Sequence, residues 1–423
     1  MVPCPSRTLA SGRVLPPIGA RVFLVGALFA IVCPSWAQEP ARPDSGFSEG
    51  TKTVVLLGNG LIEESQTSGY LETRLARRFP DRRIDFRNLG WTGDTVWARA
   101  RTSGYQNPSG LDRLKKQTAE LKPDLIIVGY GLTESFEGPP GLDKFKDGYG
   151  KLLDLLAGIT PHLVLLSPAP HEDLGRPTPD PAEHNKNLEL FGEAIRDIAG
   201  RRRLPFVDLF HPLAQAKRAA PGLHLSTNGI LLGDPGYWLV SLELERQLGL
   251  SRPPWRLDLR ASGEQKNSSG VKVSDLVSAP DALQWKQVED QLPAPPAPGS
   301  AQGLVASLEP SPVLAVSGLR EGDWTLSVNG QAIVSAPARG WESGVSLTRG
   351  ASFDQVEALR HSISKRNGLY TRRWRPINDW PAHYTYIAPD YALYDGLVAE
   401  LDEQIAAQSK PAVQAFSLTL KKP

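Results

Sequence analysis

The chain has 423 residues, and its 47 Lys and Arg nearly balance its 46 Asp and Glu, giving a formal net charge of +1. This balance argues against a nucleic-acid binder, which would concentrate positive charge on one face. Both cysteines, Cys4 and Cys33, fall in the first 37 residues, so the rest of the chain has no thiol nucleophile, disulfide or cysteine metal site.

The first 37 residues have the pattern of a secretory signal peptide. Arg13 and Arg21 precede an apolar run over 22–32, and small residues up to Ala37 form a cleavage site. The run is shorter than the roughly 20 residues that a membrane-spanning helix needs, and no later stretch approaches that length. We therefore expect residues 1–37 to be removed and the mature protein to be exported, periplasmic or extracellular, with no transmembrane segment.

Residues 52–250 alternate buried-strand patterns with helical patterns. The expected strands are Thr53–Leu57, Ile84–Leu89, Leu125–Val128, Leu163–Ser167 and Phe206–Leu209. The expected helices are Tyr70–Phe79, Leu111–Leu121, Leu142–Ala157, His184–Ala199 and Tyr237–Leu248. This alternation predicts an α/β fold, a doubly wound parallel sheet between two layers of helices, with ligands bound at the carboxyl ends of the strands.

The composition changes after Ser251. Residues 251–300 include a Pro- and Ala-rich stretch at 292–298 and are expected to form an irregular connection. Residues 301–423 are expected to form a small module of a β-hairpin and helices. Its elements are strands at Pro312–Leu319 and Asp323–Val328, a hairpin turn at Asn329-Gly330 leading into Gln331–Val334, and helices at Phe353–Asn367 and Leu393–Ala407. The aromatic and basic residues of 370–386 would stack on sugar rings if exposed, or pack against the first domain.

The stretch Gly58-Asn59-Gly60 directly follows the first expected strand, a position that normally serves a ligand. A Gly-x-Gly at this point also begins the dinucleotide fingerprint, but Glu63 stands where its third glycine belongs. An exported protein also rarely meets a nicotinamide cofactor, so no cofactor is expected. The histidines lack the spacing of a zinc site, so no metal is expected either.

Four polar segments share the strand ends and the start of the last helix. In chain order they are Gly58–Gly60, Asn88–Thr95, Gly129–Glu134 and Asn228–Leu231. Their order and spacing resemble the SGNH, or GDSL, hydrolases, a family of α/β esterases and lipases. The family's four blocks read Gly-Asp-Ser, Asn-x-x-x-x-Gly-x-Thr, Gly-x-Asn-Asp and Asp-x-x-His. The second block is the specific one, because Asn88, Gly93 and Thr95 all match it.

The resemblance implies a serine nucleophile, a histidine base oriented by an aspartate, and an oxyanion hole shared by three blocks. The family's serine, oxyanion glycine, asparagine, aspartate and histidine fall on Gly60, Gly93, Thr133, Asn228 and Leu231. The last register follows from the Gly236-Tyr237 pair, which lies five residues after the histidine in the family. The nucleophile and the base are therefore expected to be lost.

Other polar groups are expected near the same edge. The segment that ends at His224 also resembles the end of an Asp-x-x-His block, which makes His224 the candidate substitute base. The ligand pocket is expected to contain Asn59, Asn88, Asp94, Glu134 and His171. His171 and His184 also have a simpler interpretation as loop residues that bond to the backbone.

Loss of the nucleophile costs on the order of 10⁶ in turnover in Ser-His-Asp enzymes. The sequence therefore favours a non-hydrolytic or atypical protein whose pocket suits acyl esters, with an acylated or anionic envelope glycan as its partner. Two alternatives stay open. An active ester hydrolase would use Ser65 or Ser135 as nucleophile with His224 or His171 as base, and an interaction protein would dock a partner through its aromatic-rich carboxyl-terminal module.

Overall fold

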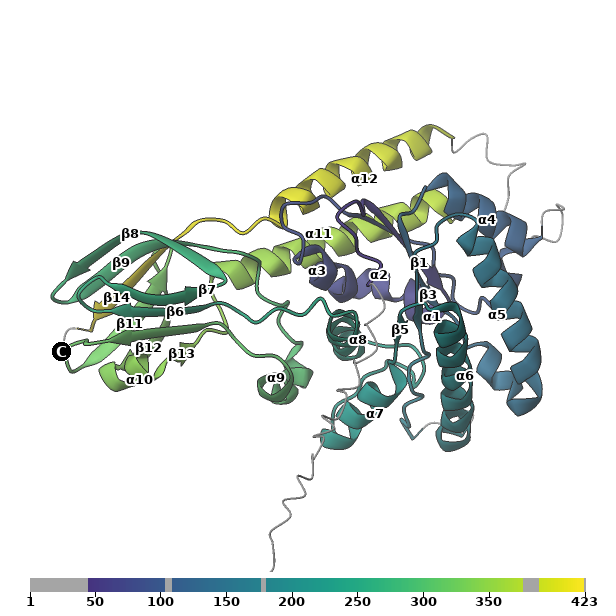
Figure 1. Cartoon of the computed structure of the whole chain (residues 1–423), viewed down its shortest axis with the longest axis horizontal. Helices are drawn as coiled ribbons and strands as arrows, with labels where there is room; N and C mark the ends of the chain where they lie inside the picture. The colour runs from purple at the N-terminus through teal and green to yellow at the C-terminus, as the bar shows by residue number, and fades with distance from the viewer. Residues whose placement is uncertain (1–44, 103–108, 176–179, 376–387, 422–423) are drawn as a thin grey trace, which may run out of the picture. The chain divides into compact units, whose positions relative to one another are not determined.

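The computed structural model describes residues 45–102, 109–175, 180–375 and 388–421, so the expected signal peptide and residues 376–386 of the aromatic stretch lie outside the described residues. Five parallel strands form the first sheet in the order β2-β1-β3-β4-β5 (Figure 1). They are β1 (Thr53–Gly58), β2 (Asp85–Asn88), β3 (Leu125–Gly129), β4 (Leu163–Leu166) and β5 (Phe206–Val207). Strands β1, β3 and β4 carry nearly continuous apolar runs because both faces of a parallel sheet are covered.

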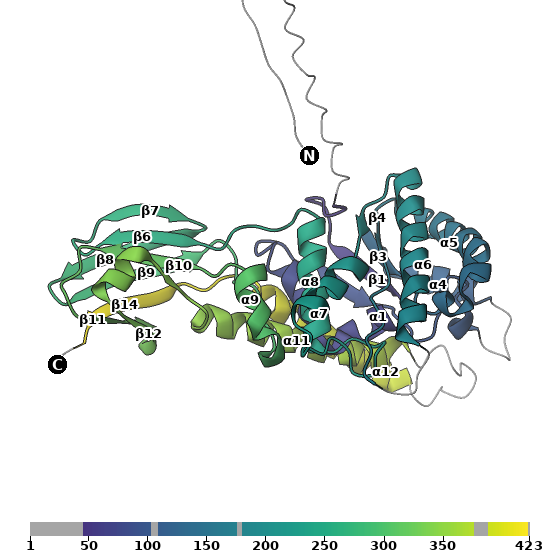
Figure 2. The same ribbon diagram turned by 90° about the horizontal axis from the view of Figure 1, so that it is seen from below.

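Helices cover both faces of this sheet. Figure 2 shows α7 and α8 on one side and α4, α5 and α6 on the other. The bounds are α1 (Gly60–Glu63), α2 (Ser65–Ser68), α3 (Tyr70–Ala76), α4 (Gly110–Glu120), α5 (Leu142–Ala157), α6 (Pro181–Arg202), α7 (Phe210–Ala219) and α8 (Asp234–Gln247), with 3₁₀ turns η1 (Arg99–Arg101), η2 (Glu134–Glu137) and η3 (Pro139–Gly141). The doubly wound α/β prediction is confirmed.

Alternate residues of each strand belong to different cores. Val54 and Leu56 pack with α3, α7 and α8, whereas Val55 and Leu57 pack with α4, α5 and α6. This alternation follows from the two-residue period of a strand. Parallel pairing aligns Gly58 at the end of β1 with Gly129 at the end of β3, so both turns leave the sheet at the same edge.

The expectation of an irregular connection at 251–300 was wrong, because most of it forms strands. Strands β6 (Arg256–Arg260), β7 (Gln265–Ser269), β8 (Val271–Ala279) and β9 (Ala282–Glu289) occupy it. The first two of these strands pair in the sheet β13-β10-β6-β7, and the other two in the sheet β12-β11-β14-β9-β8. Strands β7 and β8 are mostly exposed, so their sequences carry little apolar alternation to indicate a strand.

The remaining strands complete these two sheets around one shared core. They are β10 (Val313–Ser317), β11 (Asp323–Val328), β12 (Gln331–Pro337), β13 (Val345–Ser346) and β14 (Gln414–Leu420). Between them lie η4 (Gly299–Ala301), α9 (Gln302–Leu308) and α10 (Ala338–Ser343). Trp255, Trp285, Trp324 and Trp341 are buried in this core, which makes the sheets a sandwich.

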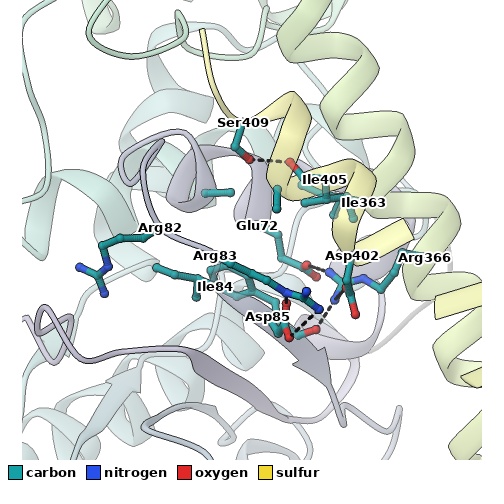
Figure 3. A pocket seen from close by; sticks show the side chains of 13 residues that line it. Glu72, Arg82, Arg83, Ile84, Asp85, Ile363, Arg366, Asp402, Ile405 and Ser409 are labelled. Atoms are coloured by element: carbon teal, nitrogen blue, oxygen red, sulfur yellow. Dashed lines mark hydrogen bonds and ion pairs between the residues drawn. The ribbon is translucent and has the colours of Figure 1, made fainter. Parts of the chain in front are cut away.

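The expected single module at 301–423 was also wrong, because its two long helices pack on the α/β domain. They are α11 (Ala351–Trp374) and α12 (Ala388–Gln408), and α11 lies along α2 and α3. Figure 3 shows Arg366 of α11 between Glu72 of α3 and Asp402 of α12. These side chains border a cavity of about 10 Å³, roughly the space of one water molecule.

A buried carboxyl in the sandwich makes the stability of the protein depend on pH. Glu289, at the end of β9, is 8% exposed and accepts a hydrogen bond from Ser352. Burial raises the pKa of Glu289 to about 7, from 4.5. Since this pKa is raised on folding, the stability that depends on protonated Glu289 is complete below about pH 4.5 and is lost as the pH rises through about 7.

We expect Glu289→Gln to remove this decline. The variant should match the wild type near pH 4.5 and exceed it at about pH 8 by on the order of 3 kcal/mol, because Gln cannot ionise. Urea denaturation at both pH values measures the difference. Glu264→Gln, at an exposed ion pair with Arg260, is the control. The same difference at both pH values would contradict the expectation.

Candidate functional site

The first block is a tight turn from β1 into α1. A Cβ at Gly58 would overlap the carbonyl oxygen of Gly129, so only glycine fits there. Asn59 caps α1, and its Oδ1 accepts the amide of Leu61 at 3.2 Å. Tyr237 of α8 donates to the carbonyl of Leu61 at 3.0 Å. The glycine of this block therefore serves close packing of two strand ends.

Gly60 lies directly against the last block. A Cβ at Gly60 would be 2.8 Å from Cδ2 of Leu231 and 3.4 Å from Oγ1 of Thr92. Leu231 therefore occupies the space that a serine side chain at Gly60 would need. Residues of the first, second and last of the four segments therefore lie together, and the register taken from Gly236-Tyr237 stays a prediction.

Two backbone donors remain available at this edge. Within the described residues, the amides of Gly60 and Gly93 donate no hydrogen bond to the protein. Gly93 is exposed, has a φ of +79°, and has no atom within 4 Å of where its Cβ would be. The second-block turn therefore opens to solvent, and its backbone angle favours glycine.

Asp94, expected to line the pocket, is buried and forms hydrogen bonds within the protein. It is fully buried, and its carboxylate accepts from the Arg101 Nε at 2.9 Å, the Tyr130 hydroxyl at 3.2 Å and the amide of Ala100 at 3.1 Å. Burial, followed by the nearby Asp94 charge, raises the pKa of Tyr130. Asp94 therefore shapes the turn beside Gly93 instead of contacting a ligand.

Glu134 has a similar internal role. Its carboxyl accepts from the amide of Val96 at 2.7 Å and from that of Gly131 at 3.0 Å, which ties the second block to the third. Burial raises the pKa of Glu134 to about 7. Thr133, the preceding residue, is half-buried at the start of η2.

Asn88 also holds the blocks together. It donates to the carbonyl of Ile62 at 2.7 Å and to Oγ of Ser65 at 3.2 Å, and it accepts the amide of Gly90 at 2.8 Å. Ser65 in turn donates to the carbonyl of Ile62. In contrast, Nδ2 of Asn59 is buried with no partner among the described residues.

The turn after β4 contains a chain of hydrogen bonds between polar side chains. Nδ1 of His171 lies 3.1 Å from Nδ1 of His184, and Nε2 of His184 lies 2.8 Å from Oγ of Ser135. Ser135 donates to the carbonyl of Leu132 at 2.7 Å, so His184 donates to Ser135 through Nε2. Burial, followed by His171, lowers the pKa of His184 to about 4. Phe136 stacks on His184 at 4.0 Å.

His224 lies at the surface beside Glu172. Its Nδ1 lies 3.0 Å from the Oε1 of Glu172, and its side chain is 64% exposed. Glu172 also accepts from the amides of Leu225 and Ser226. Asn228 accepts the amide of Leu231 at 2.8 Å, which fixes the turn of the last block. The sequence did not indicate Glu172 as the centre of this loop, because the partners named here lie more than fifty positions away and Lys217, which also pairs with it, is distant as well.

Metal and membrane features are absent from the described ranges. No group of three or more His, Cys, Asp or Glu side chains there could hold a metal ion. No helix of those ranges is long and apolar enough to cross a membrane.

Comparison with known proteins agrees with this arrangement. Residues 58–230 match the model of the GDSL-like Lipase/Acylhydrolase family. The α/β part of this chain is therefore similar to that family. No curated protein matches the chain.

Solved structures extend the likeness beyond this domain. BT4096, described as a gut microbial diltiazem-metabolizing enzyme, is 18% identical with a TM-score of 0.70, covering 89% of this chain and 98% of its own. At that identity the match shows a shared fold. A catalytic mutant of Axe2, an acetylxylan esterase from Geobacillus stearothermophilus, is 15% identical with a TM-score of 0.39, covering 49% of this chain and 99% of its own. LAE5, an alpha/beta hydrolase enzyme from the metagenome of Lake Arreo, Spain, is 17% identical with a TM-score of 0.39, covering 49% of this chain and 100% of its own.

Proposed function

We propose that this protein is an exported member of its family that binds an acyl group or carboxylate and does not hydrolyse esters. The observation that carries the proposal is the contact of Leu231 with Gly60, where Cδ2 lies 2.8 Å from the position of a side-chain Cβ. Glycine has no attacking oxygen, and leucine cannot accept a proton. Both groups that would drive ester cleavage in the family are therefore absent from this point.

Binding is supported by what remains around the same point. The amides of Gly60 and Gly93, which donate to no acceptor among the described residues, are the two backbone donors that would hold the oxygen of an acyl group. The internal bonds of Asp94 and Glu134 keep the Gly93 turn in place without a ligand. An acylated or anionic glycan fits these donors, and residues 1–37 would direct the protein to where such glycans occur.

We expect purified mature protein not to hydrolyse p-nitrophenyl acetate above the buffer rate, because Gly60 and Leu231 stand where the resemblance places the nucleophile and the base. Acetate should still bind and shift the amide resonances of Gly60 and Gly93 in a nitrogen-15 NMR titration. Chloride at equal ionic strength is the control. Ester turnover would contradict the absence of hydrolysis, and unshifted amides would contradict acyl binding.

A second candidate function, an active hydrolase, rests on Ser135 and its 2.8 Å contact with His184. A nucleophile beside a base that a third group orients is the arrangement of a catalytic triad. Ser135 is fully buried, however, and its hydroxyl proton is directed to Leu132. Turnover that disappears in Ser135→Ala would establish this function instead.

A further inference from the structure

The carboxyl end of α11 reaches the second block from outside the family's domain. Helix α11 ends at Trp374, followed by Arg375, whereas the family match ends at residue 230. Along its length α11 is attached to the carbonyls of α2. Ser364 donates to Thr67 at 2.8 Å, and Arg360 donates to Ser68 at 2.8 Å. Arg375 is therefore brought to the site by a helix that is held independently of it.

Glu63 connects Arg375 to the second-block turn. One carboxylate oxygen of Glu63 pairs with Nη1 of Arg375, and the other accepts the amide of Thr92. The Glu63 side chain is 14% exposed and that of Arg375 is 26% exposed. Thr92 directly precedes Gly93, so this pair fixes one end of the turn that carries the free amide.

Arg375 also covers the tryptophan that begins the turn. Its Cζ lies 4.0 Å from the centroid of Trp91, and Trp374 meets Trp91 edge-on at 6.0 Å. The amide of Trp91 donates to Gly58 at 2.9 Å. The turn is thus attached to the first block by its backbone and to α11 by its side chain.

We propose that Arg375 is a positioning residue of the site, which orients the Gly93 amide through Glu63 and Trp91. Helix α11 is then a wall of the ligand site. The ligand role of this wall rests on the proposed acyl binding, but the orientation of the turn does not. The two ideas can therefore fail separately.

Arg375→Ala tests the inference, with Arg372→Ala as the matched control because Arg372 is exposed on the same helix. Without ligand, we expect Arg375→Ala to raise hydrogen exchange of the Thr92 and Asp94 amides by about tenfold, equivalent to roughly 1.4 kcal/mol of lost protection. Near-ultraviolet circular dichroism of the Trp91–Trp374 pair should change as well. Arg375→Lys, which retains the charge beside Glu63, should restore much of the Thr92 protection, and Arg372→Ala should change neither signal.

A double variant keeps the test informative if the turn tolerates the loss of the stacking of Arg375 on Trp91. Glu63→Gln combined with Arg375→Ala should raise exchange no further than Arg375→Ala alone, because both act through one bridge. Additive effects, or unchanged Thr92 exchange in Arg375→Ala, would overturn the inference. Weaker acetate binding in Arg375→Ala would extend the inference to the ligand. Acetate binding that stays unchanged while exchange rises would refute α11 as a wall of the ligand site.

Discussion

We expect Glu245→Ala to cost at least about 3–5 kcal/mol of unfolding free energy, because it removes the carboxylate from a buried group of arginines. Glu245 pairs with Arg74 at 2.9 Å, with Arg77 at 3.0 Å and with Arg78. These four side chains are each at most 3% exposed. Burial lowers the pKa of Arg77 to about 10. Without Glu245, Glu309, paired with Arg74, would be the one carboxylate among the described residues left to offset three buried positive charges.

Urea denaturation followed by tryptophan fluorescence measures this loss. Glu193→Gln serves as the control, since Glu193 and Arg196 form an exposed pair on α6 and such pairs contribute less than about 1 kcal/mol. A Glu245→Ala variant as stable as the control would show that water reaches these arginines and solvates them.

The second large effect is a gain of ester turnover on restoring the family's residues. The variant combines Gly60→Ser, Leu231→His, Asn228→Asp and Thr133→Asn. Leu231→His removes the Cδ2 that would crowd the introduced serine side chain at 2.8 Å. Gly60 has no positive φ, so serine meets no backbone strain there. We expect p-nitrophenyl acetate hydrolysis about 10²–10⁴-fold above buffer, the range that a positioned base supplies.

The matched control carries alanine in place of the introduced serine and keeps the other three substitutions. It should be inert, because its base has no hydroxyl to activate. Gly60→Ser alone should also be inert and less stable than the quadruple variant, because Leu231 must then move. A folded quadruple variant without activity would indicate a pocket reshaped away from the geometry of an esterase.

Much of the α/β domain could be predicted from the sequence because its signals are local. The buried runs at Thr53–Leu57 and Leu125–Val128 gave the strands to within a residue, and α5 matched its prediction at both ends. The place of the site stays a prediction, which rests on the meeting of parallel strand ends at one edge. The contact of Leu231 with Gly60 followed from a short sequence landmark, Gly236-Tyr237.

The rest depended on partners that are distant in the sequence. The sequence alone does not distinguish an Asp94 or Glu134 that contacts a ligand from one that stabilises a turn. The bonds of Asp94 to Arg101 and Tyr130, and of Glu134 to the Val96 amide, show the second role. Helix α11 was expected within the carboxyl-terminal module. Its amphipathic pattern shows that one face is buried, but it does not indicate which surface that face packs against. Arg375 beside Glu63 shows the same limit, since 312 positions separate them.

Fluorophosphonate labelling of the wild-type chain, measured by intact mass, tests the absence of a nucleophile most directly. The probe reacts with any activated serine whatever ester the site prefers, so it does not depend on knowing the ligand. We expect no added mass, because in the proposed register Gly60 stands at the nucleophile position, and because Ser135 is buried with its proton directed to Leu132. Stoichiometric labelling of Ser65 or Ser135 would contradict this result and make the protein an active hydrolase with a substitute nucleophile.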